Sequence, residues 1–305
     1  MKRPRNVVVL MGGFSEERPI SLKSGAAVEG ALRQAGYKTR RCDPAHRHFV
    51  KTIVRMRSQL DVAFIALHGP GGEDGVMQGF LEVLKLPYTG SGVLASALAM
   101  NKNKAKEFFT LHGIPTPLYQ VAVKGQSLTM KLKCPVVVKP SSGGSTIGVT
   151  LVKETRRLSA ALAQAWRYDE EAIVEEYIHG QELTVGVLGG KALPVMEIIP
   201  EGEFYDYKAK YALGGSRHLI PPLVSMRVQV EAQRLAIRAH EVLNCRGATR
   251  TDFRYNAKTK KLYVLEINTL PGCTSTSLLP EAARAAGLSF PALVSQLVEE
   301  AWGRS

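Results

Sequence analysis

The chain has 305 residues, 45% of them hydrophobic and 22% charged, which is the composition of an ordinary globular protein with about two or three domains. No apolar run reaches the roughly 18 residues that a membrane span needs, and the four cysteines lie far apart without a C-x-x-C pair, so we expect a cytoplasmic protein with reduced thiols and no membrane partner. The net charge of +13 is compatible with nucleic-acid binding, but the sequence contains no nucleic-acid motif and no stripe of stacking aromatics, so we expect no nucleic-acid partner.

The N-terminal third alternates short apolar runs with amphipathic stretches. This alternation predicts an α/β domain in which a parallel sheet carries helices on both faces, with flavodoxin-like strand order. The first helix is expected to begin near Ser21 as a cap and to stop at Gly36. The expected strands span residues 6–11, 37–43 and 61–67, and the expected helices 21–36, 47–60 and 75–86.

Two glycine-rich loops follow the first and third of these strands. In open α/β sheets, ligands bind beyond the carboxyl ends of the strands, where strand order reverses. The loops "GGFSEERPIS" (12–21) and "HGPGGEDG" (68–75) are therefore expected to meet at a ligand site. The alternative is that they are plain turns carrying surface charge. The polar side chains that they offer are Glu16, Glu17, Ser21, His68, Glu73 and Asp74.

A boundary near residues 95–101 precedes a basic helix that ends at Gly113, and a third glycine-rich loop lies further along the chain. In "CPVVVKPSSGGSTIGVTLV" (134–152), a buried strand ends at Lys139, a Gly/Ser loop follows, and another strand begins. Backbone N–H groups of such a loop can cradle phosphates while the lysine supplies positive charge. It is not a Walker A loop, because no G-K-[ST] opens a helix, and the loop alone would equally suit a hairpin.

The next strand places Ile173, Glu175 and Tyr177 on one face, with Glu182 just beyond the turn. Such a face is suited to contact with an adenine and a ribose. The alternative is an edge strand without a ligand. Residues 204–218 form a polar stretch that is expected to act as a lid.

The stretch "VLEINTLPGCTSTSLLP" (264–280) carries Glu266 and Asn268 on one strand face. If it pairs with "ATRTDFRYN" (248–256) in a hairpin folded near Thr259, Asp252 lies opposite Glu266 on the same face. Two opposed carboxylates repel each other, and a divalent cation bound between them turns this repulsion into a net attraction. Mg²⁺ prefers such hard oxygen ligands. The alternative is a solvated face on which Arg250 and Arg254 neutralise the acids.

Taken together, these motifs resemble an ATP-grasp ligase of the D-alanine–D-alanine ligase family, over essentially the whole chain. The resemblance implies an ATP-grasp fold behind a flavodoxin- or Rossmann-like N-terminal domain. It implies an N-terminal substrate-binding domain over residues 1–98, a central ATP-grasp subdomain over 99–182 and a C-terminal catalytic subdomain over 183–305. The motifs that carry it are "GGFSEERPISLKSG", "ALHGPGGEDGVMQGFLEVLKLPYTGSGVLASALAMNK", "VVVKPSSGGSTIGV", "FYDYKAKY" and "LEINTLPGCTSTSLLP".

The resemblance also implies roles for individual residues. ATP would lie between the central and C-terminal subdomains, and Asp252, Glu266 and Asn268 would hold two Mg²⁺ ions, with Mn²⁺ as a substitute. The residues implied to contact ATP are Lys102, Lys139, Glu175, Tyr177, Ile178, Glu182, Phe204 and Lys210. The residues implied to serve the two D-alanines and the chemistry are Glu17, His68, Ser145, Tyr211, Arg250, the Gly272 backbone, Ser277 and Leu278.

The implied activity is ATP-dependent joining of two D-alanines through an acyl phosphate, for peptidoglycan precursors, by a cytoplasmic homodimer. Tyr211 in the lid favours the dipeptide over D-alanyl-D-lactate. Asn101 and the run from Ser142 to Gly144 depart from the family's usual Asp and Glu at matching positions, and Phe14 replaces a common Thr. The alternatives are another ATP-grasp carboxylate–amine ligase and a nucleotide-binding protein without catalysis.

Overall fold

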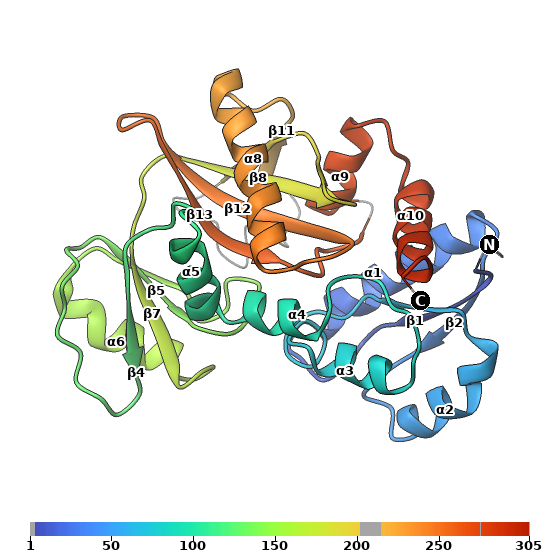
Figure 1. Cartoon of the computed structure of the whole chain (residues 1–305). Helices are drawn as coiled ribbons and strands as arrows, with labels where there is room; N and C mark the ends of the chain where they lie inside the picture. Colours follow the sequence, from blue (N-terminus) through green and yellow to red (C-terminus); the bar gives the residue numbers. More distant parts are fainter. Residues whose placement is uncertain (1–3, 202–214, 275, 305) are drawn as a thin grey trace.

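The computed structural model of the chain describes residues 4–201, 215–274 and 276–304, arranged around three sheets (Figure 1). The described helices are α1 (Arg18–Gln34), α2 (Phe49–Met56), α3 (Val76–Val83), α4 (Val93–Met100), α5 (Lys102–Leu111), α6 (Leu158–Ala165), α8 (Met226–Val242), α9 (Leu278–Ala285) and α10 (Phe290–Trp302). The described strands are β1 (Asn6–Leu10), β2 (Lys38–Cys42), β3 (Val62–Ile65), β4 (Tyr119–Val123), β5 (Val136–Pro140), β6 (Thr150–Val152), β7 (Glu171–Glu176), β8 (Gln181–Leu188), β9 (Lys191–Ala192), β10 (Met196–Pro200), β11 (Ser216–Leu219), β12 (Ala248–Asn256) and β13 (Lys261–Asn268).

The N-terminal sheet is parallel with the order β2-β1-β3, which confirms the predicted α/β alternation and strand order. Side chains of its strands alternate between two cores. One face packs on Phe49 and Ile53 of α2 and on Leu81 of α3. The other face packs on α1 and also on α10, from the far end of the chain, through Leu293 and Leu297 (Figure 1). The C-terminal helix therefore completes the N-terminal domain.

The first helix begins earlier than the sequence pattern indicated. Glu17 is its N-cap and Pro19 lies in its first turn, so Ser21 is a buried residue inside the helix and not its cap. The prediction was wrong because it passed over Pro19, whose fixed φ favours the first turn of a helix. This early start fixes Glu17 at the mouth of the loop after β1.

The other two sheets are antiparallel, and residues of both line one cavity. The central sheet has the order β4-β7-β5-β6, and the larger sheet has the order β11-β10-β8-β12-β13, with β9 paired to β8. β12 and β13 form the predicted hairpin, and Asp252 is in register with Glu266. The division of the chain at residues 98/99 and 182/183 stays a prediction. In the described part of the chain, no helix has the length and apolar character needed to cross a membrane.

The turn between β7 and β8 depends on a glycine. Gly180 has φ +133°, and a Cβ at this position would lie 2.0 Å from the backbone oxygen of Tyr255. We expect Gly180→Ala to lower the free energy of unfolding by about 1–3 kcal/mol, because β12 must shift to admit the methyl group. Urea denaturation measures this loss.

The matched control is Gly30→Ala in α1. A Cβ at Gly30 meets no heavy atom of the described residues within 4 Å, so this change should be neutral or stabilise by roughly 0.5–1 kcal/mol. An unchanged urea midpoint for Gly180→Ala would show that the turn does not need its glycine.

Candidate active site

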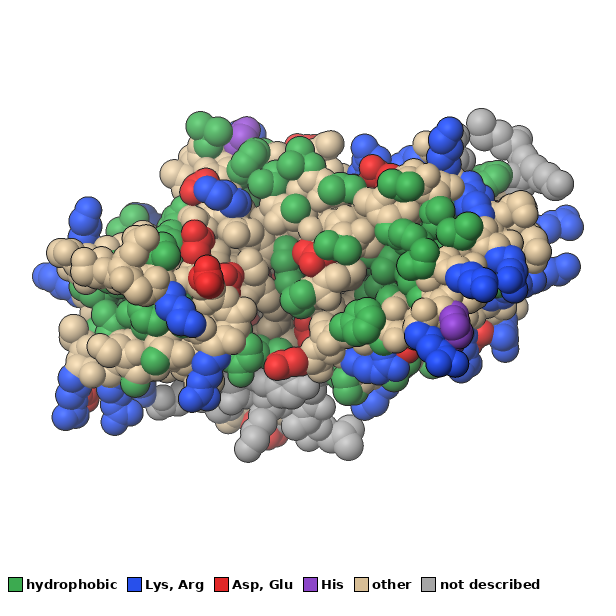
Figure 2. Space-filling view, turned by 90° about the horizontal axis from the view of Figure 1, so that it is seen from below, with side chains coloured by type: hydrophobic (Ala, Val, Ile, Leu, Met, Phe, Trp, Pro, Cys, Tyr) green, Lys and Arg blue, Asp and Glu red, His purple; other side chains and the backbone are tan. Residues whose placement is uncertain are grey.

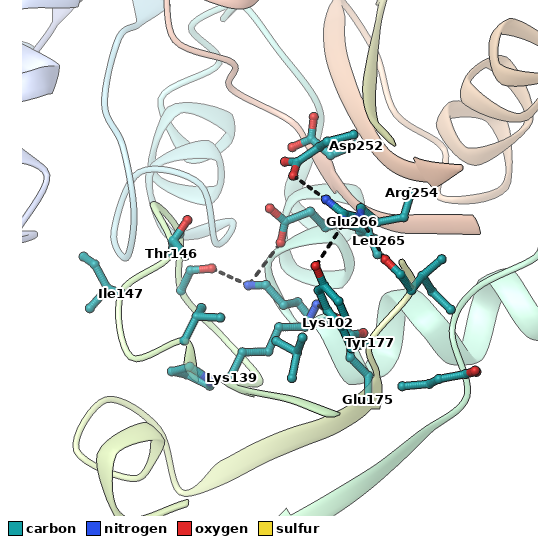
Figure 3. A pocket seen from close by; sticks show the side chains of 18 of the residues that line it. Lys102, Lys139, Thr146, Ile147, Glu175, Tyr177, Asp252, Arg254, Leu265 and Glu266 are labelled. Carbon is teal, nitrogen blue, oxygen red and sulfur yellow. Dashed lines mark hydrogen bonds and ion pairs between the residues drawn. The ribbon is translucent and has the colours of Figure 1, made fainter. Parts of the chain in front are cut away.

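Two cavities adjoin where the three sheets meet. The narrow cavity, of about 100 Å³, lies between the central sheet and the β12–β13 hairpin (Figure 3). The wide cavity, of about 540 Å³, extends from the hairpin to the loops of the N-terminal domain. They share four lining residues, so they form one continuous site. The shared residues are Lys102, Gly143, Gly144 and Glu266.

Within the described part of the chain, every residue to which the resemblance gives a role at ATP, the metal or the D-alanines lines one of these cavities. Those around the narrow cavity are Lys102, Lys139, Glu175, Tyr177, Ile178, Glu182, Asp252 and Glu266. Those around the wide cavity are Glu17, His68, Lys102, Ser145, Arg250, Glu266, Asn268, Gly272, Ser277 and Leu278. Phe204, Lys210 and Tyr211 lie outside the described residues.

A buried charge cluster lies at the floor of the narrow cavity. Lys139 Nζ is 2.7 Å from Glu175 Oε1, and Lys106 Nζ is 2.9 Å from Glu175 Oε2. Burial raises the pKa of the Glu175 carboxyl, but the attraction of Lys106 and Lys139 outweighs burial and holds it below its ordinary value. Burial lowers the pKa of Lys106 to about 8, with Glu175 opposing the shift and Lys139 adding to it. Glu175 is therefore an ionised hydrogen-bond acceptor at the buried floor of the narrow cavity.

Arg254 organises the outer wall of the narrow cavity. Its guanidinium donates to the Ile178 carbonyl at 3.1 Å, to Glu182 at 3.2 Å and to the Tyr177 hydroxyl at 3.3 Å, and it lies 5.5 Å from the centre of the Tyr177 ring. Tyr177 and Ile178 lie in the turn after β7, and Glu182 lies on β8 opposite Arg254, so Arg254 holds this turn against the larger sheet.

The oxygen ligands expected for a metal lie on one face of the hairpin. Asp252 opposes Glu266, and Asn268 follows on β13 opposite Arg250. Asp252 accepts two hydrogen bonds from Arg250, at 2.9 and 2.8 Å, and one from the Thr184 hydroxyl at 2.7 Å. An arginine does neutralise this carboxylate, as expected for the alternative of a solvated face, but Asp252 is only 7% exposed and Glu266 is half-buried, so this part of the face is largely shielded from solvent.

This donor set suits a magnesium ion. It offers two carboxylates and one amide oxygen, without sulfur or imidazole, and Mg²⁺ is commonly held by one or two carboxylates together with substrate phosphates. Lys102 Nζ lies 3.7 Å from Glu266 Oε2, so a lysine stands beside the position where those phosphates would approach. A metal bound here would compete with Arg250 for Asp252.

The Gly/Ser loop between β5 and β6 covers the junction of the two cavities. Ser145 and Thr146 have left-handed φ values of 53° and 61°, which are costly for residues with a side chain and often mark ligand loops. Lys102 Nζ donates to the Gly143 carbonyl at 2.5 Å, and Asp169 accepts from the Ser142 N–H at 2.7 Å. Asn101, one of the departures from the family pattern, caps α5 through the Lys104 N–H.

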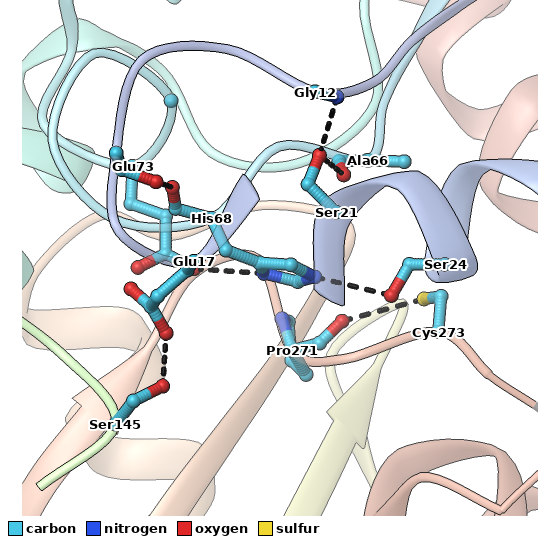
Figure 4. A network of polar contacts seen from close by, with 12 residues as sticks. Gly12, Glu17, Ser21, Ser24, Ala66, His68, Glu73, Ser145, Pro271 and Cys273 are labelled. Carbon is cyan, nitrogen blue, oxygen red and sulfur yellow. Dashed lines mark hydrogen bonds and ion pairs between the residues drawn. The ribbon is translucent and has the colours of Figure 1, made fainter. Parts of the chain in front are cut away.

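The same loop reaches the N-terminal domain. The Ser145 hydroxyl donates a hydrogen bond to Glu17, which is 6% exposed (Figure 4). Nearby, His68 Nδ1 lies 3.4 Å from Glu73 and its Nε2 lies 3.2 Å from the Ser24 hydroxyl. A buried carboxylate and an oriented imidazole thus face the wide cavity from the loops after β1 and β3.

Three polar residues of those loops have other roles. Ser21 accepts from the Gly12 N–H and donates to the Ala66 carbonyl, so it joins the two loops (Figure 4). Asp74 accepts from the N–H groups of Gly71 and Val76 and closes its own turn. Glu16 is exposed and lines neither cavity. Ser21 and Asp74 therefore shape the loops, while Glu17, His68 and Glu73 face the ligand space.

The hydroxyl-rich loop after β13 ends at the N-terminus of α9. Ser277 is the N-cap of this helix, and its hydroxyl lies 2.7 Å from the Thr274 hydroxyl. N–H groups at a helix N-terminus favour anions. This end of the wide cavity is suited to a carboxylate.

Sequence reasoning missed four residues that hold the site. Lys106 lies in the interior of helix α5, Thr184 and Arg254 lie on strands, and Asp169 lies in a loop. A signal existed for Arg254 and Thr184, since period two places Arg254 on the same face of its strand as Asp252 and Thr184 on the same face of its strand as Glu182. No local pattern distinguishes Lys106 from the surface lysines of the same helix.

Comparison with known proteins identifies the family of the chain. Residues 39–91 match the family model described as the D-ala D-ala ligase N-terminus, and residues 110–299 match the model described as the D-ala D-ala ligase C-terminus. A D-alanine–D-alanine ligase of Rhodospirillum rubrum is 50% identical over 301 residues, covering 97% of this chain and 98% of that protein. The corresponding protein of Agrobacterium fabrum is 48% identical over 304 residues, covering 97% and 98%.

Solved structures agree with the fold. A Bacillus anthracis D-alanine–D-alanine ligase complexed with ATP superposes with a TM-score of 0.86 at 30% identity, covering 97% of each chain. The VanG D-Ala:D-Ser ligase of Enterococcus faecalis superposes with a TM-score of 0.84 at 28% identity, covering 98% of this chain and 100% of that one. The fold and the site define an ATP-grasp ligase. The chain belongs to the D-alanine–D-alanine ligase family.

Proposed function

We propose that this protein joins two D-alanine molecules to D-alanyl-D-alanine with ATP, supplying a peptidoglycan precursor. The observation that carries the proposal is the junction of the two cavities at Lys102 and Glu266. A nucleotide bound in the narrow cavity directs its terminal phosphate toward the wide cavity, where the carboxylate substrate binds. Membership of the family supports the same reaction.

The narrow cavity takes the nucleotide. Tyr177, Ile178 and Glu175 border the adenine, and Glu182 meets the ribose. Lys102 and Lys139 neutralise phosphates, together with Lys210. Phe204 and Lys210 belong to the lid, outside the described residues. Glu175 accepts hydrogen bonds, which supports adenine as the base bound here, because the exocyclic amino group of adenine is a donor.

The hairpin face takes the divalent metal. Asp252, Glu266 and Asn268 hold two Mg²⁺ ions in this proposal, with Mn²⁺ as a substitute. Such ions neutralise phosphate charge and polarise the transferring phosphoryl group. The chain's own contribution is to place Lys102 beside Glu266, so that phosphate oxygens meet fixed positive charge without reorganisation.

The wide cavity takes both amino acids. Glu17 binds the ammonium of the first D-alanine, and His68 borders it. Ser145 connects Glu17 to the loop that covers the phosphates, and Tyr211 extends this connection into the lid. Ser277 and Leu278 receive the carboxylate of the second D-alanine at the start of α9.

The reaction has two steps. The carboxylate of the first D-alanine attacks the γ-phosphorus of ATP, which releases ADP and forms an acyl phosphate. The amine of the second D-alanine, having lost a proton to solvent, attacks the acyl carbon, and phosphate leaves with its bonding electron pair. Arg250 and the Gly272 N–H stabilise the oxyanion of the tetrahedral intermediate. Exclusion of water by the covering loop protects the acyl phosphate from hydrolysis.

We also propose a cytoplasmic homodimer that binds neither membranes nor nucleic acid. The charge distribution supports the last point. On the face in Figure 2, Lys and Arg side chains are scattered over both ends, with acidic side chains between them, instead of forming one continuous basic stripe.

The test is phosphate release from ATP across a panel of D- and L-amino acids and D-lactate, with the product identified by mass spectrometry. We expect release only with Mg²⁺ and D-alanine together, and a product with the mass of the dipeptide. D-serine or D-lactate preferred as acceptor would assign the chain to a related ligase with another second substrate.

Excess chelator supplies the control. Full turnover in its presence would remove the metal from the mechanism. ATP binding without any turnover, whichever amino acid is added, would favour a nucleotide-binding protein without catalysis.

A further inference from the structure

A lysine lies beneath the floor of the narrow cavity without lining it. Lys106, in α5, has a fully buried side chain, and its Nζ is 2.9 Å from Glu175 Oε2. Its ammonium also donates to the Thr116 hydroxyl at 2.6 Å and lies 5.3 Å from the centre of the Tyr119 ring. Lys106 therefore reaches a ligand only through Glu175.

The two lysines that flank Glu175 differ in access. Lys139 lines the cavity and holds Oε1 at 2.7 Å, whereas Lys106 faces the buried Oε2. In the proposed function, Lys139 turns toward a nucleotide phosphate. Oε1 is then free to accept a ligand N–H, and Lys106 becomes the remaining counter-charge beside Glu175.

The charge of Glu175 decides which purine it accepts. An ionised carboxylate only accepts hydrogen bonds, so it pairs with the 6-amino group of adenine and repels the 6-oxo group of hypoxanthine. A buried carboxylate that loses its counter-charge takes up a proton. The resulting O–H donates to a 6-oxo group, and discrimination is lost.

We propose that Lys106 is a positioning residue that keeps Glu175 ionised and directed at the purine 6-position while Lys139 serves the phosphates, so that selection of ATP over 6-oxo purine triphosphates depends on Lys106. The proposal rests on the proposed nucleotide site and adds to it a residue that never touches the ligand. The other charged or titratable groups near this cluster are Lys139 on β5, Tyr119 on β4 and Glu266 on β13.

The test compares Lys106→Met with the wild type in binding and turnover of ATP and of inosine triphosphate. Methionine is also unbranched, is shorter than lysine by the terminal nitrogen alone, and removes the charge. We expect the preference for ATP to fall at least about tenfold, through Kd and KM more than through kcat. Lys106→Arg should restore part of the preference. Lys104→Met, an exposed lysine of the same helix, is the matched control and should leave the preference unchanged.

The pH dependence gives a second readout. Between about pH 6 and pH 7 the wild-type preference should stay constant, because Lys106, with its pKa of about 8, stays charged there and Glu175 stays ionised. In Lys106→Met the preference should be lowest at the acid end and recover as pH rises, because a carboxyl without its counter-charge ionises only at higher pH. An equal loss of binding for both nucleotides at every pH would overturn the proposal and leave Lys106 a packing residue.

The double variant Lys106→Met/Glu175→Gln covers the case in which the single change prevents folding, since it removes both members of the ion pair. Its preference should equal that of Glu175→Gln alone, because Lys106 acts only through the carboxylate. A further drop in the double variant would contradict the proposal. Nucleotide binding is measured without amino acids, so a failure of the ligase reaction itself would not be confused with a failure of this inference.

Discussion

Replacing Glu266 with Gln is expected to lower the rate of dipeptide formation at least about 100-fold, equivalent to about 2.7 kcal/mol of lost transition-state stabilisation. The change removes one negative charge from the face that Asp252 and Asn268 share, and it also removes the carboxylate beside Lys102. Steady-state rates over a range of Mg²⁺ concentrations measure the loss, and the half-saturating Mg²⁺ concentration should rise.

The fold should survive this substitution. Gln has nearly the shape of Glu, and Glu266 faces Asp252 across the hairpin, where like charges destabilise by roughly 0.2–1 kcal/mol. Without metal, the thermal midpoint should therefore stay the same or rise slightly, and added Mg²⁺ with ATP should raise it less than in the wild type. Glu299→Gln, on the exposed side of α10, is the control for loss of a carboxylate elsewhere. A near-wild-type rate for Glu266→Gln would exclude the hairpin as the metal site.

Replacing Arg250 with Met should lower kcat about 100- to 1,000-fold, the usual cost of removing one oxyanion donor. Its effect on stability should differ from that of Glu266→Gln. Arg250 forms a two-point pair with Asp252 at 2.9 and 2.8 Å, and both side chains are largely buried. Removing the guanidinium leaves a buried carboxylate that keeps its hydrogen bond from the Thr184 hydroxyl but loses its counter-charge, which should cost about 3–5 kcal/mol without metal.

Mg²⁺ with ATP should restore much of the stability that Arg250→Met has lost, because the metal supplies a new counter-charge to Asp252. In this variant the metal also has no arginine to compete with for Asp252. The ligand-induced rise in thermal midpoint should therefore be larger for Arg250→Met than for the wild type, and smaller for Glu266→Gln. Arg238→Met, on the exposed face of α8, controls for loss of an arginine. Equal midpoint shifts in all three proteins would mean that metal and arginine do not share Asp252.

Much of the local structure could be predicted from the sequence alone. Alternation of apolar runs indicated the parallel N-terminal sheet, and strand periodicity was sufficient to place Asp252 opposite Glu266. These features follow from side-chain periods of 2 and 3.6 residues, which depend only on neighbours in the chain. The proposed role of each site residue came from resemblance to a family and not from periodicity.

The tertiary structure decided which distant side chains meet. Ser145 and Glu17 are 128 residues apart and share a hydrogen bond, and Lys106 differs from Lys104 only in the face of α5 that it occupies. α10 covers a sheet formed by the first residues of the chain. Local patterns carry no information about such pairs, because burial and partner charge arise only when separate elements pack. The sequence thus determined the strands and the oxygen-bearing side chains on their faces. Packing decided that the buried Lys106 lies beside Glu175 and that Arg250 pairs with Asp252.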